Sequence, residues 1–168
     1  MNDSPLARDL MSRPVRQLKA WTSVRQAAAF LLRHRISGAP VLGEHGDWEG
    51  VFTLSDLART VQSRILPPPR GRILEDRGPV PNPFGLPPEE LAKTPVREFM
   101  TAGLVSVFPE ATLEEIIHTL LSFKVHRVFV IEGRKGAIVG VITTMDILRH
   151  LERRSLKPSG KRKRTRQG

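Results

Sequence analysis

The chain has 168 residues, no cysteine and a formal net charge of +10 at pH 7. This length suits one domain of ordinary size, or two halves that share a core. The lack of cysteine excludes a disulfide framework, a thiol nucleophile and a thiolate zinc site, and it fits a reducing compartment, so we expect a cytoplasmic protein. There is no run of 18 apolar residues and no N-terminal pattern typical of a secretion signal, so we expect no membrane span.

The positive charge is concentrated at the C-terminus, where six lysines and arginines fall within the last 12 residues. Residues 153–168 offer no apolar anchor after Leu156, and their composition predicts a disordered basic tail. Two interpretations of this tail remain open. It is either a solvated segment that aids solubility, or an arm that binds nucleic acid through salt-sensitive phosphate contacts.

The chain contains an internal repeat. Residues 8–42 align without a gap to residues 97–131, and residues 50–61 align to residues 140–151 after one residue of slip. In the second alignment five of 12 pairs are identical, most densely in a shared Gly-Val-x-Thr-x-x-Asp string. Two copies at so long a period predict a pseudo-symmetric pair of half-domains rather than an open repeat array.

Each copy begins with a predicted lead-in strand, at residues 15–18 and 104–108, and continues into an amphipathic helix. The helix starts are marked by capping boxes, in which the hydroxyl and the third side chain satisfy each other's backbone N–H. The capping pairs are Ser23 with Gln26 and Thr112 with Glu115. The apolar positions at helical spacing are Val24, Ala27, Ala28, Leu31 and Leu32 in the first copy, and Leu113, Ile116, Ile117, Leu120 and Leu121 in the second.

Two short apolar runs separated by a glycine-containing polar turn follow each helix. They predict two strands joined by a tight turn, at residues 39–42 and 51–52 in the first copy and at 128–131 and 138–142 in the second. A second helix is predicted after them, with apolar residues at helical spacing. These are Leu57, Ala58 and Val61, matched by Ile147, Leu148 and Leu151. Each half is therefore predicted to be a β-α-β-β-α unit of the α/β class.

A proline-rich connector at residues 65–93 separates the half-domains, which we place at residues 1–64 and 94–152. Nine prolines lie between residues 66 and 95. Proline removes backbone donors and restricts the residue before it, so regular structure should be interrupted. A short helix at 87–93 fits, because proline is tolerated in a first helical turn. The rest is either an ordered crossover or a mobile loop.

A Thr-x-x-Asp motif lies where a strand enters a helix in both copies, with Thr53 and Asp56 in the first and Thr143 and Asp146 in the second. One interpretation is purely structural, because this spacing itself caps a helix. The other is functional. Free N–H groups and hydroxyls at a helix N-terminus suit a phosphate, and a carboxylate one turn further suits a ribose diol, which together describe a nucleotide site.

The ordered set of motifs resembles the CBS domain pair, also called the Bateman module. The resemblance rests on the lead-ins Arg-Asp-Leu-Met-Ser at 8–12 and Arg-Glu-Phe-Met-Thr at 97–101, on the segments 36–42 and 125–131, and on the two Gly-Val-x-Thr-x-x-Asp strings. It implies two β-α-β-β-α halves packed about a pseudo-twofold axis, and a homodimer of two such pairs. It also implies an adenosine ligand, AMP, ADP, ATP or S-adenosylmethionine, in clefts between the repeats.

The resemblance assigns residue roles position by position. Asp56 and Asp146 would hold the ribose hydroxyls. The other assigned residues are Thr53, Ser55, Thr143 and Thr144 beside ribose or phosphate, Val15 and Leu104 on the adenine ring, and the backbone of Gly38, Ala39, Pro40, Arg127, Val128 and Phe129 along its edge.

His126 and Arg127 stand where some members of the family supply phosphate-binding side chains. The alternative is that they are only a solvent-facing strand start. The first copy has Ser37 and Gly38 at these positions and offers no cation. The sequence therefore predicts that a phosphate-rich ligand prefers the site of the second copy.

Motifs of phosphate-loop, dinucleotide, serine-hydrolase and zinc-protease enzymes do not occur in the sequence, and we expect neither catalysis nor a bound metal. The leading hypothesis is a regulatory module that binds an adenosine-containing small molecule. An alternative is a dimeric interaction scaffold whose basic arm binds nucleic acid. A third is a scaffold with empty clefts.

Deletion of residues 156–168 separates the first two hypotheses. If the tail is a nucleic-acid arm, the truncated chain should lose RNA or DNA binding, and the binding of the full chain should weaken with added salt, because phosphate contacts release counterions. The measurement is a binding titration of both chains at two salt concentrations. Equal binding by the two chains would rule out a role of the tail.

Overall fold

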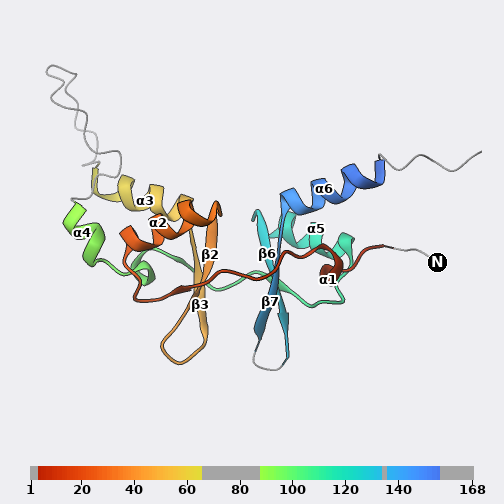
Figure 1. Ribbon diagram of the computed structural model, residues 1–168, viewed down its shortest axis with the longest axis horizontal. Helices are drawn as coiled ribbons and strands as arrows, with labels where there is room; N and C mark the ends of the chain where they lie inside the picture. Colours follow the sequence, from red (N-terminus) through yellow and green to blue (C-terminus); the bar gives the residue numbers. More distant parts are fainter. Residues whose placement is uncertain (1–3, 66–87, 134–135, 156–168) are drawn as a thin grey trace, which may run out of the picture. The chain divides into compact units, whose positions relative to one another are not determined.

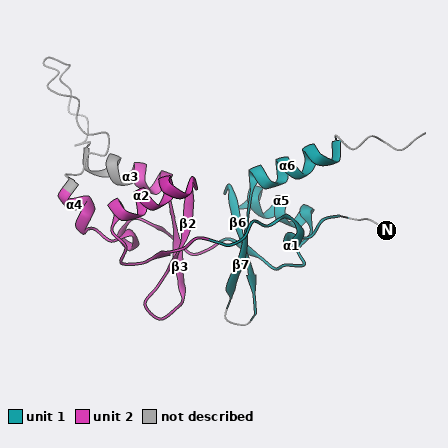
Figure 2. Cartoon of the chain, in the orientation of Figure 1, with its two compact units in different colours: residues 1–15, 105–168 teal, residues 16–104 magenta. Residues whose placement is uncertain are grey.

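The computed structural model describes residues 4–65, 88–133 and 136–155. Within them the chain forms two compact units, one of residues Met1–Val15 with Val105–Gly168 and the other of residues Arg16–Leu104 (Figure 2). We call the first unit 1 and the second unit 2. The basic tail and most of the proline-rich connector lie outside the described residues.

Unit 2 is built on a four-stranded sheet in the order β1-β2-β3-β4. Its central strands β2 and β3 are labelled in Figure 1. β1 pairs in parallel with β2, while β2 with β3 and β3 with β4 are antiparallel. The strands are β1 (Leu18–Lys19), β2 (Gly38–Leu42), β3 (Trp48–Thr53) and β4 (Thr101–Ala102). The helices are α2 (Val24–His34), α3 (Leu54–Ile65), α4 (Pro88–Lys93) and the 3-10 turn η1 (Val96–Glu98).

Unit 1 repeats this plan with a three-stranded sheet in the order β5-β6-β7. β5 again pairs in parallel with β6, and β6 with β7 is antiparallel. The strands are β5 (Ser106–Val107), β6 (Arg127–Glu132) and β7 (Ala137–Thr143). The helices are α1 (Ala7–Leu10), α5 (Leu113–Ser122) and α6 (Thr144–Ser155).

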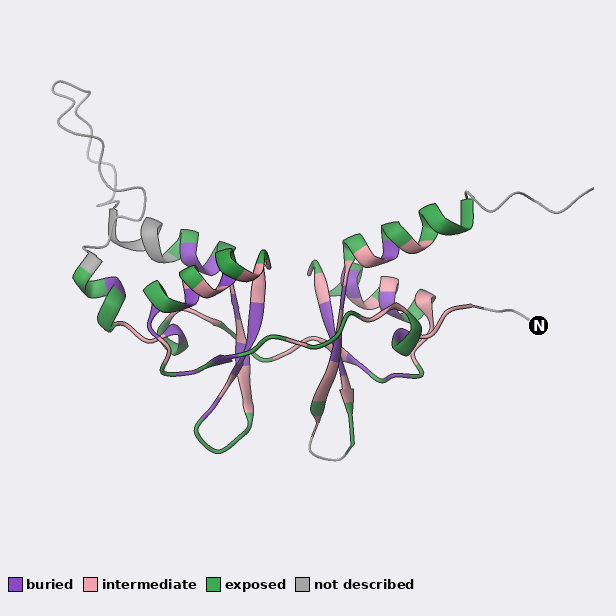
Figure 3. Ribbon diagram, viewed as in Figure 1, coloured by how far each residue is buried: buried purple, intermediate pink, exposed green. Residues whose placement is uncertain are grey.

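Each unit has its own apolar core, formed where the inner faces of its helices meet its sheet (Figure 3). Phe52, Leu31 and Val24 are fully buried in unit 2, and Ile116 and Ile142 are fully buried in unit 1. Burial of this apolar surface supplies most of the stabilisation of such small units. No helix in the described part of the chain is long and apolar enough to cross a membrane.

The helices and the strand pairs predicted in both repeats are confirmed, including both capping boxes. The lead-in strands differ from the prediction, because β1 begins only at Leu18 and β5 covers only Ser106–Val107. Ser23 Oγ accepts from Gln26 N at 3.3 Å, and Thr112 Oγ1 accepts from Glu115 N at 3.3 Å. The short helix predicted at residues 87–93 is α4. The four-residue helix α1 and the strand β4 were not predicted, because each is too short to show a period.

The lead-in segment of each repeat packs on the body of the other repeat. In unit 1, Ser12 N donates to Val141 O at 2.9 Å. In unit 2, the aligned Thr101 pairs with Val51 as part of β4. A second matched pair of bridges joins Leu6 to Thr112 in unit 1, and Ser23 to Pro95 in unit 2. Each compact unit therefore contains parts of both sequence repeats.

We call this packing of each lead-in on the other repeat the exchange of lead-ins. The glycines that begin the two Gly-Val strings, Gly50 and Gly140, make room for it. A Cβ on Gly50 would overlap the backbone carbonyl oxygen of Thr101. A Cβ on Gly140 would overlap the side chain of Met11, which belongs to the other lead-in. Because Gly50 and Gly140 have no side chain, each lead-in can pack directly against the sheet of the other repeat.

We predict that Gly50→Ala destabilises the chain more than Gly140→Ala. The backbone of Thr101 is fixed in a strand and cannot yield. At Gly140 the Sδ and Cγ atoms of Met11 can leave by a change of rotamer, and only the Met11 Cβ, at 2.8 Å, requires a shift of the backbone. Overpacking of this kind costs about 1–3 kcal/mol. The free energy of unfolding in urea measures it, and equal losses in both variants would contradict the expectation.

Candidate functional site

The Thr-x-x-Asp motif of the first repeat forms a closed cap between β3 and α3. Thr53 N donates to Asp56 Oδ2 at 2.7 Å, and Asp56 N donates to Thr53 Oγ1 at 3.2 Å. The Asp56 side chain is fully buried. The motif is thus a reciprocal cap in which aspartate replaces the usual glutamate or glutamine.

The second repeat builds the same cap between β7 and α6. Thr143 N donates to Asp146 Oδ2 at 2.8 Å, and Asp146 N donates to Thr143 Oγ1 at 3.3 Å. The structural interpretation of the motif is therefore correct. It accounts for one carboxylate oxygen, Oδ2, in each copy.

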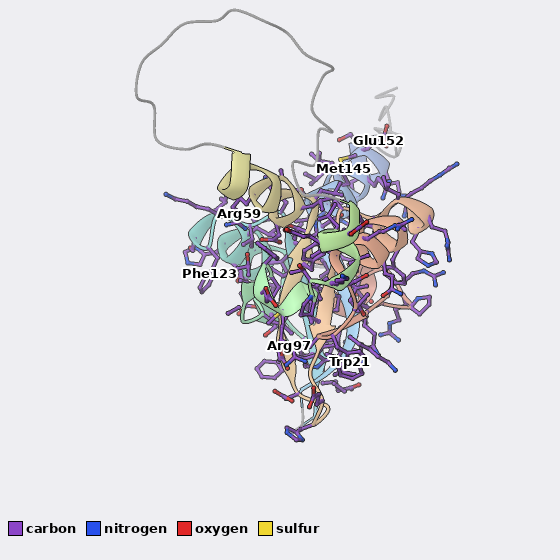
Figure 4. All side chains as sticks on the ribbon, turned by 90° about the vertical axis from the view of Figure 1, so that its left-hand side faces the viewer. Trp21, Arg59, Arg97, Phe123, Met145 and Glu152 are labelled. Atoms are coloured by element: carbon purple, nitrogen blue, oxygen red, sulfur yellow. The ribbon has the colours of Figure 1, made fainter. Side chains whose placement is uncertain are left out.

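The second oxygen, Oδ1, faces the exchanged lead-in and an arginine one turn along the helix. In unit 2, Thr101 Oγ1 donates to Asp56 Oδ1 at 3.1 Å, and Arg59 forms an ion pair with the same oxygen. Arg59 also reaches Thr101 Oγ1, at 3.2 Å. Arg59, labelled in Figure 4, comes from the first turns of α3. Both oxygens of the Asp56 carboxylate therefore have hydrogen-bond or ion-pair partners within the protein.

In unit 1 the corresponding contacts are longer. Ser12 Oγ donates to Asp146 Oδ1 at 3.4 Å, and Arg149 Nη1 lies 3.3 Å from that oxygen. The Asp146 side chain is 13 % exposed, whereas that of Asp56 is 0 % exposed. Bonds of this length are weak, so Oδ1 of Asp146 is the more available acceptor.

A cavity of about 430 Å³ opens beside Asp146. Its mostly polar wall is formed by α1, by the two residues that follow α1, and by α6. The lining residues are Asp9, Leu10, Met11, Ser12, Asp146, Arg149, His150 and Arg153. Within the described residues, His150 Nε2 is shielded from solvent without a hydrogen-bond partner. The lining of the cavity thus includes two carboxylates, those of Asp9 and Asp146, together with two arginines and a histidine.

Of the residues assigned from the sequence, only Asp146 is among those that line this cavity. Gly38 is opposite Thr53 in the sheet of unit 2, and Arg127 is opposite Thr143 in that of unit 1. The carbonyl of His126 accepts from Thr144 N at 3.2 Å. The strand residues Ala39, Pro40 and Val128 are buried, Ser55, Thr144 and His126 are exposed, and Val15 and Leu104 are half-buried.

Four residues that complete the caps were not assigned from the sequence. They are the lead-in hydroxyls of Ser12 and Thr101 and the helix cations Arg59 and Arg149. The signal was present, because Arg59 aligns with the identical Arg149 and both lead-in motifs end in a hydroxyl residue. Only the exchange of the lead-ins shows which aspartate each hydroxyl meets.

Comparison with known proteins places this arrangement in a family. The model of the CBS domain matches residues 7–63 and again residues 96–153. The two matches cover most of the chain and coincide with the internal repeat. The chain belongs to the CBS domain family and carries two CBS repeats in tandem.

Its relatives include proteins of quite different size. An uncharacterized protein of Methanocaldococcus jannaschii is 25 % identical over 159 residues, covering 87 % of this chain and 90 % of the relative. The inosine-5'-monophosphate dehydrogenase of Aquifex aeolicus is 28 % identical over 133 residues, covering 79 % of this chain but only 21 % of the enzyme. The chain therefore spans about a fifth of that enzyme's length.

Among solved structures, the fold is similar to that of the CBS domain pair of protein MJ0100. The TM-score is 0.67 at 19 % sequence identity, covering 90 % of this chain and 98 % of the other. That CBS pair was crystallised in complex with 5'-methylthioadenosine and S-adenosyl-L-methionine. At this identity the comparison establishes the fold.

We predict that removal of the carboxylate charge lowers the free energy of unfolding by different amounts at the two caps. Asp56→Asn should lower the free energy of unfolding by about 1–3 kcal/mol, because it leaves buried donors without their acceptor. Asp146→Asn should cost less, since water can replace its longer bonds. Urea unfolding followed by circular dichroism measures both, with Asp47→Asn in the exposed β2–β3 turn as control. A larger loss for Asp146→Asn would contradict the structural comparison.

Proposed function

We propose that the chain is a non-catalytic regulatory module of the cytoplasm that binds an adenosine-containing ligand, AMP, ADP, ATP or S-adenosylmethionine, and acts as a homodimer. Binding occurs where the lead-in of one repeat meets the Thr-x-x-Asp cap of the other. The adenosine ligands of the similar CBS pair of protein MJ0100 support this choice of ligand class.

The observation that carries the proposal is that the two oxygens of each repeated aspartate have different roles. Oδ2 caps the helix in each copy and is fully used. Asp146 lines the cavity, and its Oδ1, which the cap does not use, is the oxygen to which a ribose diol would donate. The cap fixes the orientation of the carboxylate, so the acceptor is already in place before a ligand arrives.

The site of unit 1 is proposed as the preferred one. Its aspartate is partly exposed, and Arg149 and Arg153 line its cavity together with the carboxylates of Asp9 and Asp146. The two guanidinium groups can contact an anionic part of a ligand. His126 and Arg127 at the start of β6 can add phosphate contacts, and the first repeat has no cation at the equivalent positions. In unit 2, by contrast, Arg59 and Thr101 already occupy Oδ1 of Asp56.

A thermal-shift titration with AMP, ADP, ATP, S-adenosylmethionine and 5'-methylthioadenosine tests the proposal. A ligand that binds only the folded chain must raise the melting temperature, and at a hundred times its Kd it adds about 2.7 kcal/mol of stability. We expect at least one adenosine ligand to give this shift, whereas guanosine and cytidine analogues should give none.

The variants Asp146→Ala and Asp56→Ala, each compared with its own ligand-free melting temperature, locate the site. Asp146→Ala should abolish most of the shift, and Asp56→Ala should retain it. Stronger loss of binding from Asp56→Ala would contradict the preference for unit 1. No shift with any adenosine ligand would leave the scaffold hypothesis in place of the proposed function.

A further inference from the structure

A basic hollow lies beside α2 in unit 2. It has a volume of about 370 Å³, and its wall is formed by β1, by residues next to β1 and by α2. The lining residues are Gln17, Leu18, Lys19, Thr22, Gln26, Ala29, Phe30 and Arg33. This wall contains two cations and two amide side chains, and none of these lining residues is acidic.

The hollow belongs to a part of the sequence that has only positive charge. Residues 10–43 include six lysines and arginines and neither aspartate nor glutamate. Arg16, Lys19 and Arg33 are exposed, and within the described residues none of the three forms an ion pair. Desolvation, followed by the charges of Arg16 and Arg33, lowers the pKa of His34 below its ordinary value. Both guanidinium groups therefore lie near that ring, on the same side of unit 2.

An accessible aromatic ring adjoins these cations. Trp21, labelled in Figure 4, follows β1 and is 48 % exposed. Lys19 Nζ lies 5.4 Å from the centroid of its ring, which is within the range of a cation–π contact. Lys19 also lines the hollow, so the indole ring and the hollow are neighbours. Positive charge and an exposed indole ring thus occur together at one place on unit 2.

The equivalent place in unit 1 has the opposite charge. The hollow there has a volume of about 780 Å³, and its lining includes the carboxylates of Glu110, Glu114 and Glu115. In the ungapped alignment of the repeats, Glu110 stands opposite Trp21, and Glu114 stands opposite Arg25. A hollow at this position is therefore a feature of the repeat, whereas its cations and its indole ring belong to the first copy.

We propose that this hollow of unit 2, together with Trp21, binds single-stranded nucleic acid. Lys19, Arg33 and the nearby Arg16 contact phosphates of the strand, and a base stacks on the indole ring of Trp21. A basic groove beside an accessible aromatic ring is the usual basis of single-strand binding. The hollow shares no residue with the two Thr-x-x-Asp caps, and the inference is independent of the proposed adenosine ligand.

The combination of groups favours a single strand over other anions. A duplex offers only the edges of its bases in its grooves, so its bases cannot stack on Trp21. An acidic segment of a protein matches the cations but has no planar ring for the indole. A mononucleotide has one base and one phosphate group, whereas a strand contacts several cations through successive phosphates and releases counterions at each.

The salt dependence of binding tests the phosphate contacts. The probe is a fluorescein-labelled dodecamer of deoxythymidine, and fluorescence anisotropy measures its affinity for the full chain at several salt concentrations. Each phosphate contact of a single strand adds about 0.7 to the slope of log K against log salt concentration. Lys19→Gln combined with Arg33→Gln should therefore lower this slope by about 1.4. Lys93→Gln combined with Lys124→Gln removes two exposed charges outside the hollow and should leave the slope unchanged.

Substitution of Trp21 tests the stacking separately from the charge. Trp21→Ala should weaken binding about tenfold and leave the salt slope as in the wild type, because the loss of one stacked base changes no phosphate contact. Trp21→Phe keeps a ring and should recover most of the affinity. Phe108→Ala removes an exposed ring at the hollow of unit 1 and should not change the affinity. Circular dichroism of each variant checks that the fold is retained.

Four results would overturn the proposal. The first is that the full chain does not bind the dodecamer at low salt. The second is that the Lys19 and Arg33 substitutions leave the slope unchanged, while deletion of residues 156–168 abolishes binding, since the tail would then be the site. The third is that poly-L-glutamate competes as well as unlabelled dodecamer and Trp21→Ala has no effect, as expected of a surface for acidic proteins. The fourth is displacement of the strand by an equal concentration of ATP. Adenosine binding is measured separately by thermal shift.

Discussion

The aspartate at the entrance of the last helix of each repeat joins three separate parts of the chain. One oxygen of Asp56 or Asp146 closes the turn from strand to helix. The other reaches the hydroxyl of a lead-in that belongs to the other repeat, and an arginine one turn along the helix. A buried carboxylate is stable only when it is fully hydrogen-bonded. The exchange of lead-ins supplies the partners that neither repeat has alone.

The glycine six residues before each aspartate serves the same exchange from the sheet side. Gly50 lies under the backbone of β4, and Gly140 lies under Met11. The spacing of the Gly-Val-x-Thr-x-x-Asp string therefore has a mechanical reason. The glycine at the start of the string leaves space for the lead-in to pack on the strand. The aspartate at the end of the string accepts a hydrogen bond from the hydroxyl of that lead-in at the start of the helix.

The sequence was sufficient for the elements whose causes are local. The capping boxes of Ser23 and Thr112 set the starts of α2 and α5, and the glycine turns set the strand pairs. The exchange of lead-ins could not be predicted, because spacing along the chain does not show which sheet edge a short segment joins. Periodicity also placed Leu32 and Leu121 with the buried stripe. In the part of the chain that the structure describes, no element covers this face of either helix, so both side chains are exposed.

The two copies agree where the chain contacts itself and differ where it faces outward. The capping contacts are nearly the same in both units, whereas Arg25 is replaced by Glu114 and Ser37 by His126 at aligned positions. In the proposed complex, this difference between the copies can link ligand binding to the packing of the lead-in that contains Ser12. A ribose hydroxyl that donates to Asp146 Oδ1 competes with Ser12 for the same oxygen, and Ser12 holds it at 3.4 Å. A ligand changes an equilibrium only through different affinities for its two states. In the proposed complex, competition for this one oxygen would supply that difference in unit 1, while the ion pair of Arg59 with Asp56 would oppose it in unit 2.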